Sequence, residues 1–186
     1  MKAYKKPWRG KGVICISILS IVLILTWISP LQATTWWDSG YHTINDGDTY
    51  GEIFLENDAV LDMFGGSALK IETLNFSTAN ILGGELETLW TNDDTCASIH
   101  AGTLNWLSAS ENSVVYLYAY DVTYHSSGGL YNNPWLEGRY YGNDNLFSFT
   151  FYHGEDDYHH INIVPEPTSI LFLGFGSLLL RRRNTR

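Results

Sequence analysis

Small and apolar residues recur along the middle of the chain with a period of eighteen residues. The small residues are Gly47, Gly65-Gly66, Gly83-Gly84, Ala101-Gly102 and Ala119-Tyr120, where only the alanine is small. Three apolar columns keep the same spacing: Ile53, Ile71, Leu89 and Leu107; Leu61, Ala79, Ala97 and Val115; Met63, Ile81, Ile99 and Leu117. Apolar and polar residues alternate within each unit, as in strands with one buried face, and no window of useful length has helical periodicity.

Short strands that repeat at a constant period, with small residues at fixed corners, are typical of a parallel β-solenoid. One coil cannot bury its own apolar face, so about four coils from Gly47 to Tyr120 are expected to share one core. The sequence therefore predicts an all-β domain with a short solenoid in residues 47–125, preceded by a lead-in at residues 34–46. An antiparallel β-sandwich with evenly spaced hairpins is the alternative.

The repeat fades after Tyr120, and residues 126–164 form a cap region rich in turn-forming residues. Alternating stretches at 146–152 and 160–164 predict two strands, and an acidic turn at 154–157 joins them. We expect these strands to pair as a C-terminal β-hairpin. The hairpin would cover the open end of the solenoid, where free strand edges favour association.

The first 33 residues have the form of a secretory signal peptide. Basic residues precede an apolar run from Val13 to Ile28, Pro30 ends the run, and Ala33 is the expected last residue before cleavage. Signal peptidase is thus an expected partner, and the segment that follows is expected to be exported through the inner membrane.

Three features follow one another near the C-terminal end. The segment Val164-Pro165-Glu166-Pro167 is expected to be extended, because proline fixes φ and lacks a backbone N–H. Residues 168–180 carry no charge and predict a transmembrane helix of ~20 Å at ~1.5 Å per residue, which is short for a bilayer. Arg181, Arg182 and Arg183 follow and mark the cytoplasmic side.

This order of motif, short apolar helix and arginine cluster resembles the PEP-CTERM sorting signal of bacterial exported proteins. The resemblance covers residues 165–186. It implies that an exosortase, a membrane-embedded enzyme similar to cysteine transpeptidases, recognises Pro165-Glu166-Pro167 and that the helix is removed afterwards. The terminal helices would hold the chain in the membrane before processing. A plain C-terminal membrane anchor is the alternative.

The segment to be exported is strongly acidic. Between Thr34 and Val164, nineteen acidic residues stand against Lys70 and Arg139, which gives a formal charge of −17. A surface of this charge repels phosphate backbones and anionic lipids, so nucleic acid is excluded as a partner. The charge is compatible with divalent cations and with neutral glycans.

The exported segment contains no phosphate-binding loop and no catalytic or metalloprotease motif. We therefore expect neither enzyme activity nor a cofactor. A carbohydrate-active enzyme on a lyase-like β-helix is an alternative, although Lys70 and Arg139 offer few groups to neutralise a substrate carboxylate. Cys96 is alone after removal of the leader and is expected to be a buried small hydrophobe.

Acidic residues close to three histidines form a weak candidate for a metal site. The acidic residues are Glu155, Asp156 and Asp157, and the histidines are His153, His159 and His160. Carboxylates would suit Ca²⁺. However, adjacent residues of a strand face opposite sides, so His159 and His160 would not share a site. A solvated acidic turn is the expectation, and a calcium-dependent carbohydrate-binding module is the alternative.

Aromatic residues supply candidate glycan contacts, since flat rings stack on sugars. Tyr116, Tyr118 and Tyr120 alternate and are expected to form a stripe on one face of a strand. Tyr131, Trp135, Tyr140 and Tyr141 lie in the turn-rich cap region. Packing within the cap is the competing interpretation for these rings.

Together, these features predict an exported structural or adhesive protein of the cell envelope or extracellular polysaccharide matrix. Its expected partners are signal peptidase, an exosortase and, as a ligand, extracellular polysaccharide. The expected location is the cell surface or the extracellular space, after transient attachment to the membrane.

Overall fold

The structure, a computed structural model, describes residues 33–165. The predicted signal peptide up to Gln32, the sorting-motif residues Glu166 and Pro167, the helix at 168–180 and the arginine cluster lie outside the described residues. No helix within the described residues is long and apolar enough to cross a membrane.

Each eighteen-residue unit forms one coil, made of a long strand, a turn, a short strand and a second turn. The long strands are β1 (Thr35–Trp37), β3 (Thr49–Leu55), β5 (Ser67–Thr73), β7 (Glu85–Thr91) and β9 (Thr103–Ala109). The short strands are β2 (Tyr41–Ile44), β4 (Val60–Met63), β6 (Thr78–Ile81), β8 (Cys96–Ile99) and β10 (Val114–Leu117). The cap contains β11 (Ala119–His125), the 3₁₀ turn η1 (Leu130–Asn132), β12 (Trp135–Tyr140), β13 (Leu146–Phe151), the one-turn helix α2 (Glu155–Tyr158) and β14 (Ile161–Ile163).

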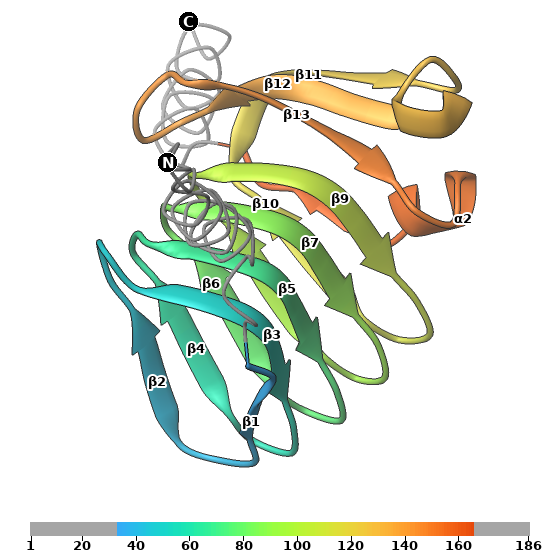
Figure 1. Cartoon of the computed structure of the whole chain (residues 1–186). Helices are drawn as coiled ribbons and strands as arrows, with labels where there is room; N and C mark the ends of the chain where they lie inside the picture. The colour runs from blue at the N-terminus through green and yellow to red at the C-terminus, as the bar shows by residue number, and fades with distance from the viewer. Residues whose placement is uncertain (1–32, 166–186) are drawn as a thin grey trace, which may run out of the picture. The chain divides into compact units, whose positions relative to one another are not determined.

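The strands of residues 33–165 form two sheets (Figure 1). The long sheet has eight strands in the order β1-β3-β5-β7-β9-β13-β12-β11, and the short sheet has six in the order β14-β10-β8-β6-β4-β2. Strands of successive coils pair in parallel with a shift of eighteen residues, so that Ile53 lies opposite Ile71 and Leu61 opposite Ala79, except that β2 pairs with β4 at a shift of nineteen. This pairing confirms the parallel solenoid and rules out the antiparallel sandwich.

The solenoid has five coils, one more than the sequence predicts, because it begins at Thr35. The predicted lead-in at residues 34–46 contains β1 and β2, which pair in parallel with β3 and β4. The lead-in is therefore the first coil.

The core lies between the two sheets and consists of the predicted apolar columns. In the long sheet, Ile53, Ile71, Leu89 and Leu107 are all fully buried. In the short sheet, the buried residues are Leu61, Ala79, Ala97, Val115, Met63, Ile81, Ile99 and Leu117. Because identical positions stack on one another along the solenoid, the same column is buried in each coil.

Two kinds of corner turn the chain between the sheets. The corners after β3, β5, β7 and β9 each have one non-glycine residue of positive φ, and these residues are Asn57, Asn75, Asp93 and Glu111. Buried hydroxyls bond at the same corner: Thr95 donates to the Asn92 carbonyl at 2.7 Å, and the Thr73 hydroxyl donates to the Thr95 hydroxyl at 2.9 Å. The corners after β2, β4, β6 and β8 each have a glycine of positive φ, at Gly47, Gly66, Gly84 and Gly102, as predicted.

The hairpin predicted from 146–152 and 160–164 is not formed. β13 lies in the long sheet, whereas β14 lies in the short sheet and pairs in parallel with β10. The predicted acidic turn between them includes most of α2, which carries the chain from one sheet to the other. β13, α2 and β14 thus add a partial coil on the last complete one.

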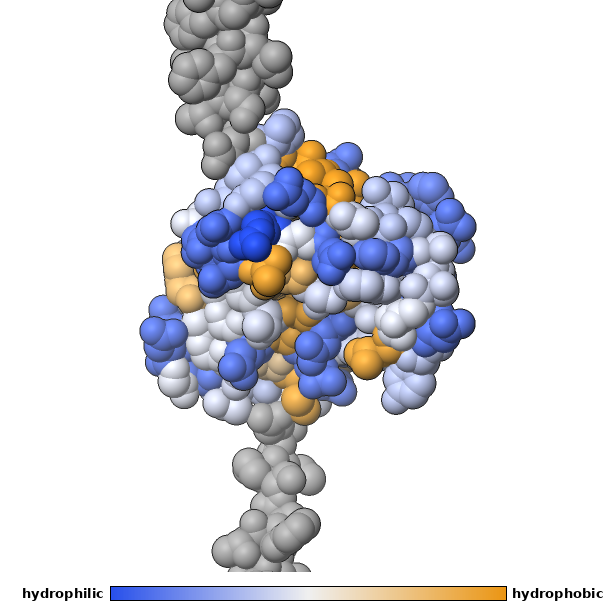
Figure 2. All heavy atoms as spheres, turned by 90° about the horizontal axis from the view of Figure 1, so that it is seen from above, coloured by the Kyte–Doolittle hydropathy of each residue, from blue (hydrophilic) through white to orange (hydrophobic). Residues whose placement is uncertain are grey.

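A different hairpin covers the end of the solenoid. β11 and β12 pair antiparallel, β12 pairs antiparallel with β13, and β13 pairs in parallel with β9 (Figure 1). Viewed from this end, the surface has hydrophilic clusters with smaller hydrophobic patches between them (Figure 2). The cap therefore changes the strand direction at the end of the long sheet and adds loops beside its outer face.

Candidate functional site

The outer face of the long sheet carries polar and aromatic side chains in register. In β5, β7 and β9 the alternation of buried and outward-facing side chains is interrupted once. Two successive residues then face outward, such as Glu87 and Thr88 on β7. Thr88 lies opposite Lys70 on one side and Trp106 on the other, and Trp90 lies opposite Glu72. Parallel stacking therefore aligns outward side chains from different coils.

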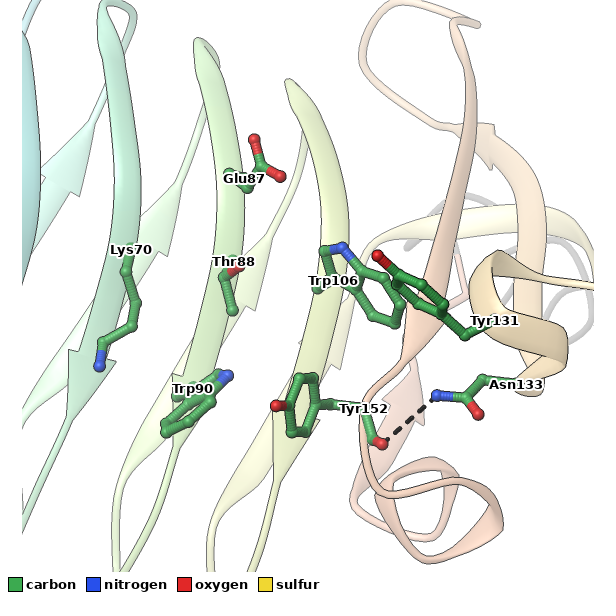
Figure 3. Close-up of a pocket in the computed structure, with 8 residues that line it drawn as sticks. All are labelled: Lys70, Glu87, Thr88, Trp90, Trp106, Tyr131, Asn133 and Tyr152. Carbon is green, nitrogen blue, oxygen red and sulfur yellow. Dashed lines mark hydrogen bonds between the residues drawn. The ribbon is translucent and has the colours of Figure 1, made fainter. Parts of the chain in front are cut away.

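A groove of about 450 Å³ lies on this face, between the solenoid and the cap (Figure 3). The solenoid contributes Lys70, Glu87, Thr88, Trp90 and Trp106. The cap contributes Tyr131, Asn133 and Tyr152, and the Asn133 side-chain amide is turned toward the Tyr152 carbonyl. The groove thus combines residues far apart in the sequence.

Four aromatic rings contact one another in sequence along the groove. The centroid of Tyr152 lies 5.5 Å from that of Trp90 and 6.0 Å from that of Trp106. Tyr131 stacks on Trp106 with centroids 5.8 Å apart and planes inclined by 23°. Such aromatic pairs have defined geometry and hold one another's orientation. The groove therefore presents ring faces and edges in fixed positions.

Tyr131 is unusual because it is both strained and exposed. Its φ is 54°, a left-handed conformation that costs ~1–3 kcal/mol for a bulky residue, and its side chain is 90% exposed. The loop around it is fixed by hydrogen bonds from the Leu130 N–H to the Thr150 hydroxyl at 3.3 Å and from the Asn133 amide to the Phe151 carbonyl at 3.1 Å. Strain that holds an exposed ring beside a groove points to a functional role.

Lys70 brings one positive charge to the groove, and this charge is balanced. Its Nζ lies 4.5 Å from the Trp90 centroid and 4.7 Å from the Phe54 centroid. The same atom lies 2.7 Å from Oε2 of Glu72, and both side chains are largely buried. The cation–π contacts and the ion pair fix the ammonium group between two rings.

Polar groups lie next to the rings. Glu87 and Thr88 line the groove, and within residues 33–165 the buried Nε1 of Trp90 has no hydrogen-bond partner. Glu87 and Thr88 are on the same side of the groove in Figure 3. A ligand with flat apolar faces and peripheral hydroxyls could stack on the rings and bond to Glu87 and Thr88.

The predicted tyrosine stripe does not form one surface. Tyr116 is on the outer face of β10, Tyr118 stacks on His100 with centroids 3.8 Å apart, and Tyr120 belongs to β11. Tyr120 stacks on Tyr141 and donates its hydroxyl to Asp144, and this bond to the carboxylate is the main cause that raises its pKa. The prediction fails because the chain turns between β10 and β11.

Among the glycan contacts predicted in the cap, the prediction for Tyr140 is wrong. Its side chain is fully buried against Phe147 with centroids 4.7 Å apart, and burial raises its pKa. Trp135 is only partly exposed and stacks on His125 at 4.0 Å. Tyr141 packs on Tyr120. These residues belong to β12 or follow it directly, so their main contacts are within the cap.

The acidic residues of α2 lie in different surroundings. Asp157 is fully buried and accepts hydrogen bonds from the backbone N–H groups of Ala109 at 2.9 Å and His153 at 2.6 Å. Glu155 and Asp156 are exposed. In the part of the chain that the structure describes, no group of three His, Cys, Asp or Glu residues is placed to hold a metal ion. Asp157 thus attaches the cap to β9.

Ser108, His153 and Asp157 lie close together but do not form a catalytic triad. The Ser108 hydroxyl and an Asp157 oxygen approach the same ring nitrogen of His153, Nδ1, at 2.9 Å and 3.5 Å. A triad requires the nucleophile and the carboxylate at different ring nitrogens. Ser108 is also buried. The cluster connects β9 to the cap.

Cys96 differs slightly from expectation, because it lies on the outer face of β8 and is half-buried. Burial raises the pKa of its thiol. A raised pKa lowers the thiolate fraction at neutral pH, so the thiol is poorly reactive.

The two predicted processing points lie at the borders of the folded segment. Ala33 is exposed, and one residue, Thr34, separates it from β1. At the other end, Pro165 is exposed, and the Val164 N–H donates to the Leu117 carbonyl at 2.9 Å.

Of the four groove rings, Tyr131 is among the predicted aromatic contacts of the cap region, whereas Trp90, Trp106 and Tyr152 were missed. Trp36, Phe54 and Trp90 share one eighteen-residue column, and this periodicity could have identified them. Tyr131 and Tyr152 have no periodic signal, since they come from the cap.

No protein-family model, curated protein or solved structure matches this chain. The candidate function therefore depends on the geometry of the groove and on the chain's own sequence features.

Proposed function

We propose that this chain is an exported, non-enzymatic structural or adhesive protein of the cell envelope or extracellular polysaccharide matrix, and that it binds neutral polysaccharide in the groove. The observation that carries the proposal is the set of four contacting rings: Trp90, Trp106, Tyr131 and Tyr152. The C–H faces of a sugar ring stack on aromatic rings, and its hydroxyls can bond to groups such as Glu87.

The charge of the segment supports a neutral ligand. The −17 formal charge between Thr34 and Val164 opposes the approach of anionic polymers. Lys70 could attract a sugar carboxylate, but Glu72 already pairs with it at 2.7 Å. A neutral glycan requires no further charge compensation.

The proposed export and sorting are supported by where the processing points fall. Cleavage after Ala33 would remove no residue of β1, and cleavage near Pro165 would remove no residue of β14. Signal peptidase and an exosortase could therefore both act without cutting into the solenoid.

Loss of the groove rings is expected to abolish polysaccharide binding. The purified protein is run in native gels containing glucan, xylan, mannan or galactan, with alginate as the acidic comparison. Retardation by at least one neutral polymer is expected, and Trp90→Ala/Trp106→Ala should weaken it by at least tenfold, which corresponds to about 1.4 kcal/mol. Tyr131→Ala should also weaken it, without a folding cost, because its ring is exposed.

Phe76→Ala is the matched control for these variants. Phe76 is 71% exposed in the turn between β5 and β6, away from the groove. Its replacement should leave retardation unchanged. The proposal is wrong if no neutral polymer retards the protein, or if the groove variants bind as the wild type does.

Sorting is expected to depend on the proline motif. Replacing Pro165, Glu166 and Pro167 by alanine in the native host should leave the precursor in the inner membrane, because the exosortase would no longer recognise it. Membrane fractionation and intact-mass measurement distinguish precursor from mature protein. Mature protein at the surface of the variant strain would contradict the sorting signal.

A further inference from the structure

The rings of the groove belong to a longer surface that crosses the solenoid. Trp36 on β1 lies opposite Phe54 on β3, which lies opposite Glu72 on β5, which lies opposite Trp90 on β7. These residues form one outward column, so their side chains follow one another across four parallel strands. Trp90 belongs both to this column and to the lining of the groove.

The far end of the column has the same character as the groove. Trp36 stacks on Phe54 with centroids 4.3 Å apart and planes inclined by 9°, and Trp36 is 59% exposed. A large exposed ring on the outer face of the first coil makes no contribution to the core. The Trp36 ring is therefore available as a second surface on which a ligand can stack.

Lys70 and Glu72 fill the interval between the two aromatic groups. The Lys70 ammonium lies between the rings of Phe54 and Trp90, and Glu72 pairs with it. The surface is therefore continuous from Trp36 to Tyr131, with rings at both ends and a neutral polar pair in the middle. Figure 3 shows Lys70 at the side of the groove opposite Tyr131.

From this continuity we infer that the protein binds an internal stretch of a long, extended neutral polysaccharide, which lies across the strands from Tyr131 to Trp36. This inference rests on the proposed function and specifies its ligand. Neighbouring strands are ~4.8 Å apart, so Trp36 and Trp90, three strand intervals apart, are separated by roughly 14 Å. A disaccharide is too short to reach both rings, whereas a chain of several sugars contacts both.

Oligosaccharide length tests the inference. Calorimetric titration of the purified protein uses cello-, xylo- and manno-oligosaccharides of two and six units. For the series that binds, the hexasaccharide should bind at least tenfold more tightly than the disaccharide. Trp36→Ala should weaken hexasaccharide binding about fivefold to tenfold and leave disaccharide binding unchanged.

The variants separate this inference from the proposed function. Trp106→Ala should weaken both ligands, and Phe76→Ala should weaken neither. Equal affinity for two and six units, or an equal effect of Trp36→Ala on both, would overturn the extended surface while leaving the groove as a binding site. If neither the oligosaccharides nor the neutral polymers bind to the wild type, the proposed function fails, and the extended surface fails with it; binding of a neutral polymer without binding of any hexasaccharide overturns the extended surface alone.

Discussion

Replacing Asp157 by alanine is expected to lower the free energy of unfolding by about 4 kcal/mol. The carboxylate is fully buried and accepts two backbone hydrogen bonds, from Ala109 on β9 and from His153 after β13. Each buried N–H that loses its acceptor costs ~1–3 kcal/mol. Since a domain is stable by only ~5–15 kcal/mol, this loss should be visible as a large shift of the urea midpoint.

Two other substitutions identify the cause. Asp156→Ala removes an exposed neighbouring carboxylate of the same helix and should change stability by less than about 0.5 kcal/mol. Asp157→Asn keeps one acceptor oxygen, so its loss of unfolding free energy should lie between those of Asp157→Ala and Asp156→Ala. Equal midpoints for Asp156→Ala and Asp157→Ala would show that the two hydrogen bonds do not stabilise the cap.

Gly84→Ala is expected to destabilise the solenoid by about 3 kcal/mol. Gly84 has φ +84°, and a Cβ there would lie 2.6 Å from the Gly65 carbonyl oxygen and 2.6 Å from Cε of Met63. The clash with the coil below involves backbone, which cannot move without disturbing the stack. Positive φ adds ~1–2 kcal/mol for a residue with a Cβ, and overpacking adds ~1–3 kcal/mol.

Gly47→Ala separates the two causes. Gly47 has φ +89° at the equivalent corner of the first coil, and a Cβ there meets no atom within 4 Å. Its replacement should therefore cost only the conformational part, about 1 kcal/mol. Thermal and urea unfolding of both variants give the comparison. A similar loss of unfolding free energy in both variants would mean that the clash of the Cβ with the neighbouring coil contributes little to the destabilisation by Gly84→Ala.

The repeat made most of the solenoid predictable, because every coil buries the same positions. The columns that include Ile71 and Ile81 are apolar in four successive units, and a stacked core is the simplest way to bury them. The first coil was missed because β1 has only three residues and because β2 pairs with β4 at a shift of nineteen, so the apolar columns of Leu61 and Met63 do not continue into it at a spacing of eighteen. The end of the domain was misread because alternation shows that a strand has a buried face but not which strand it pairs with.

The site was less predictable than the fold for the same reason. Trp90 and Trp106 lie within the eighteen-residue repeat. They become part of a groove only because Tyr131 and Tyr152, which belong to the cap, contact them. Tyr140 shows the converse error. It lies in a region rich in turn residues, yet it is the last residue of β12, where alternation turns it inward.

The way in which the chain leaves the domain has a mechanical consequence. β14 is the last strand before Pro165, and it is held along β10 by parallel pairing and by the bonds from Val115 N–H to the His160 carbonyl and from Val164 N–H to the Leu117 carbonyl. A pull on the C-terminal end acts along β14, while these bonds run across the strands. The load is then shared in shear by the whole strand, so the domain resists tension better than it would if the strand could be peeled away one bond at a time.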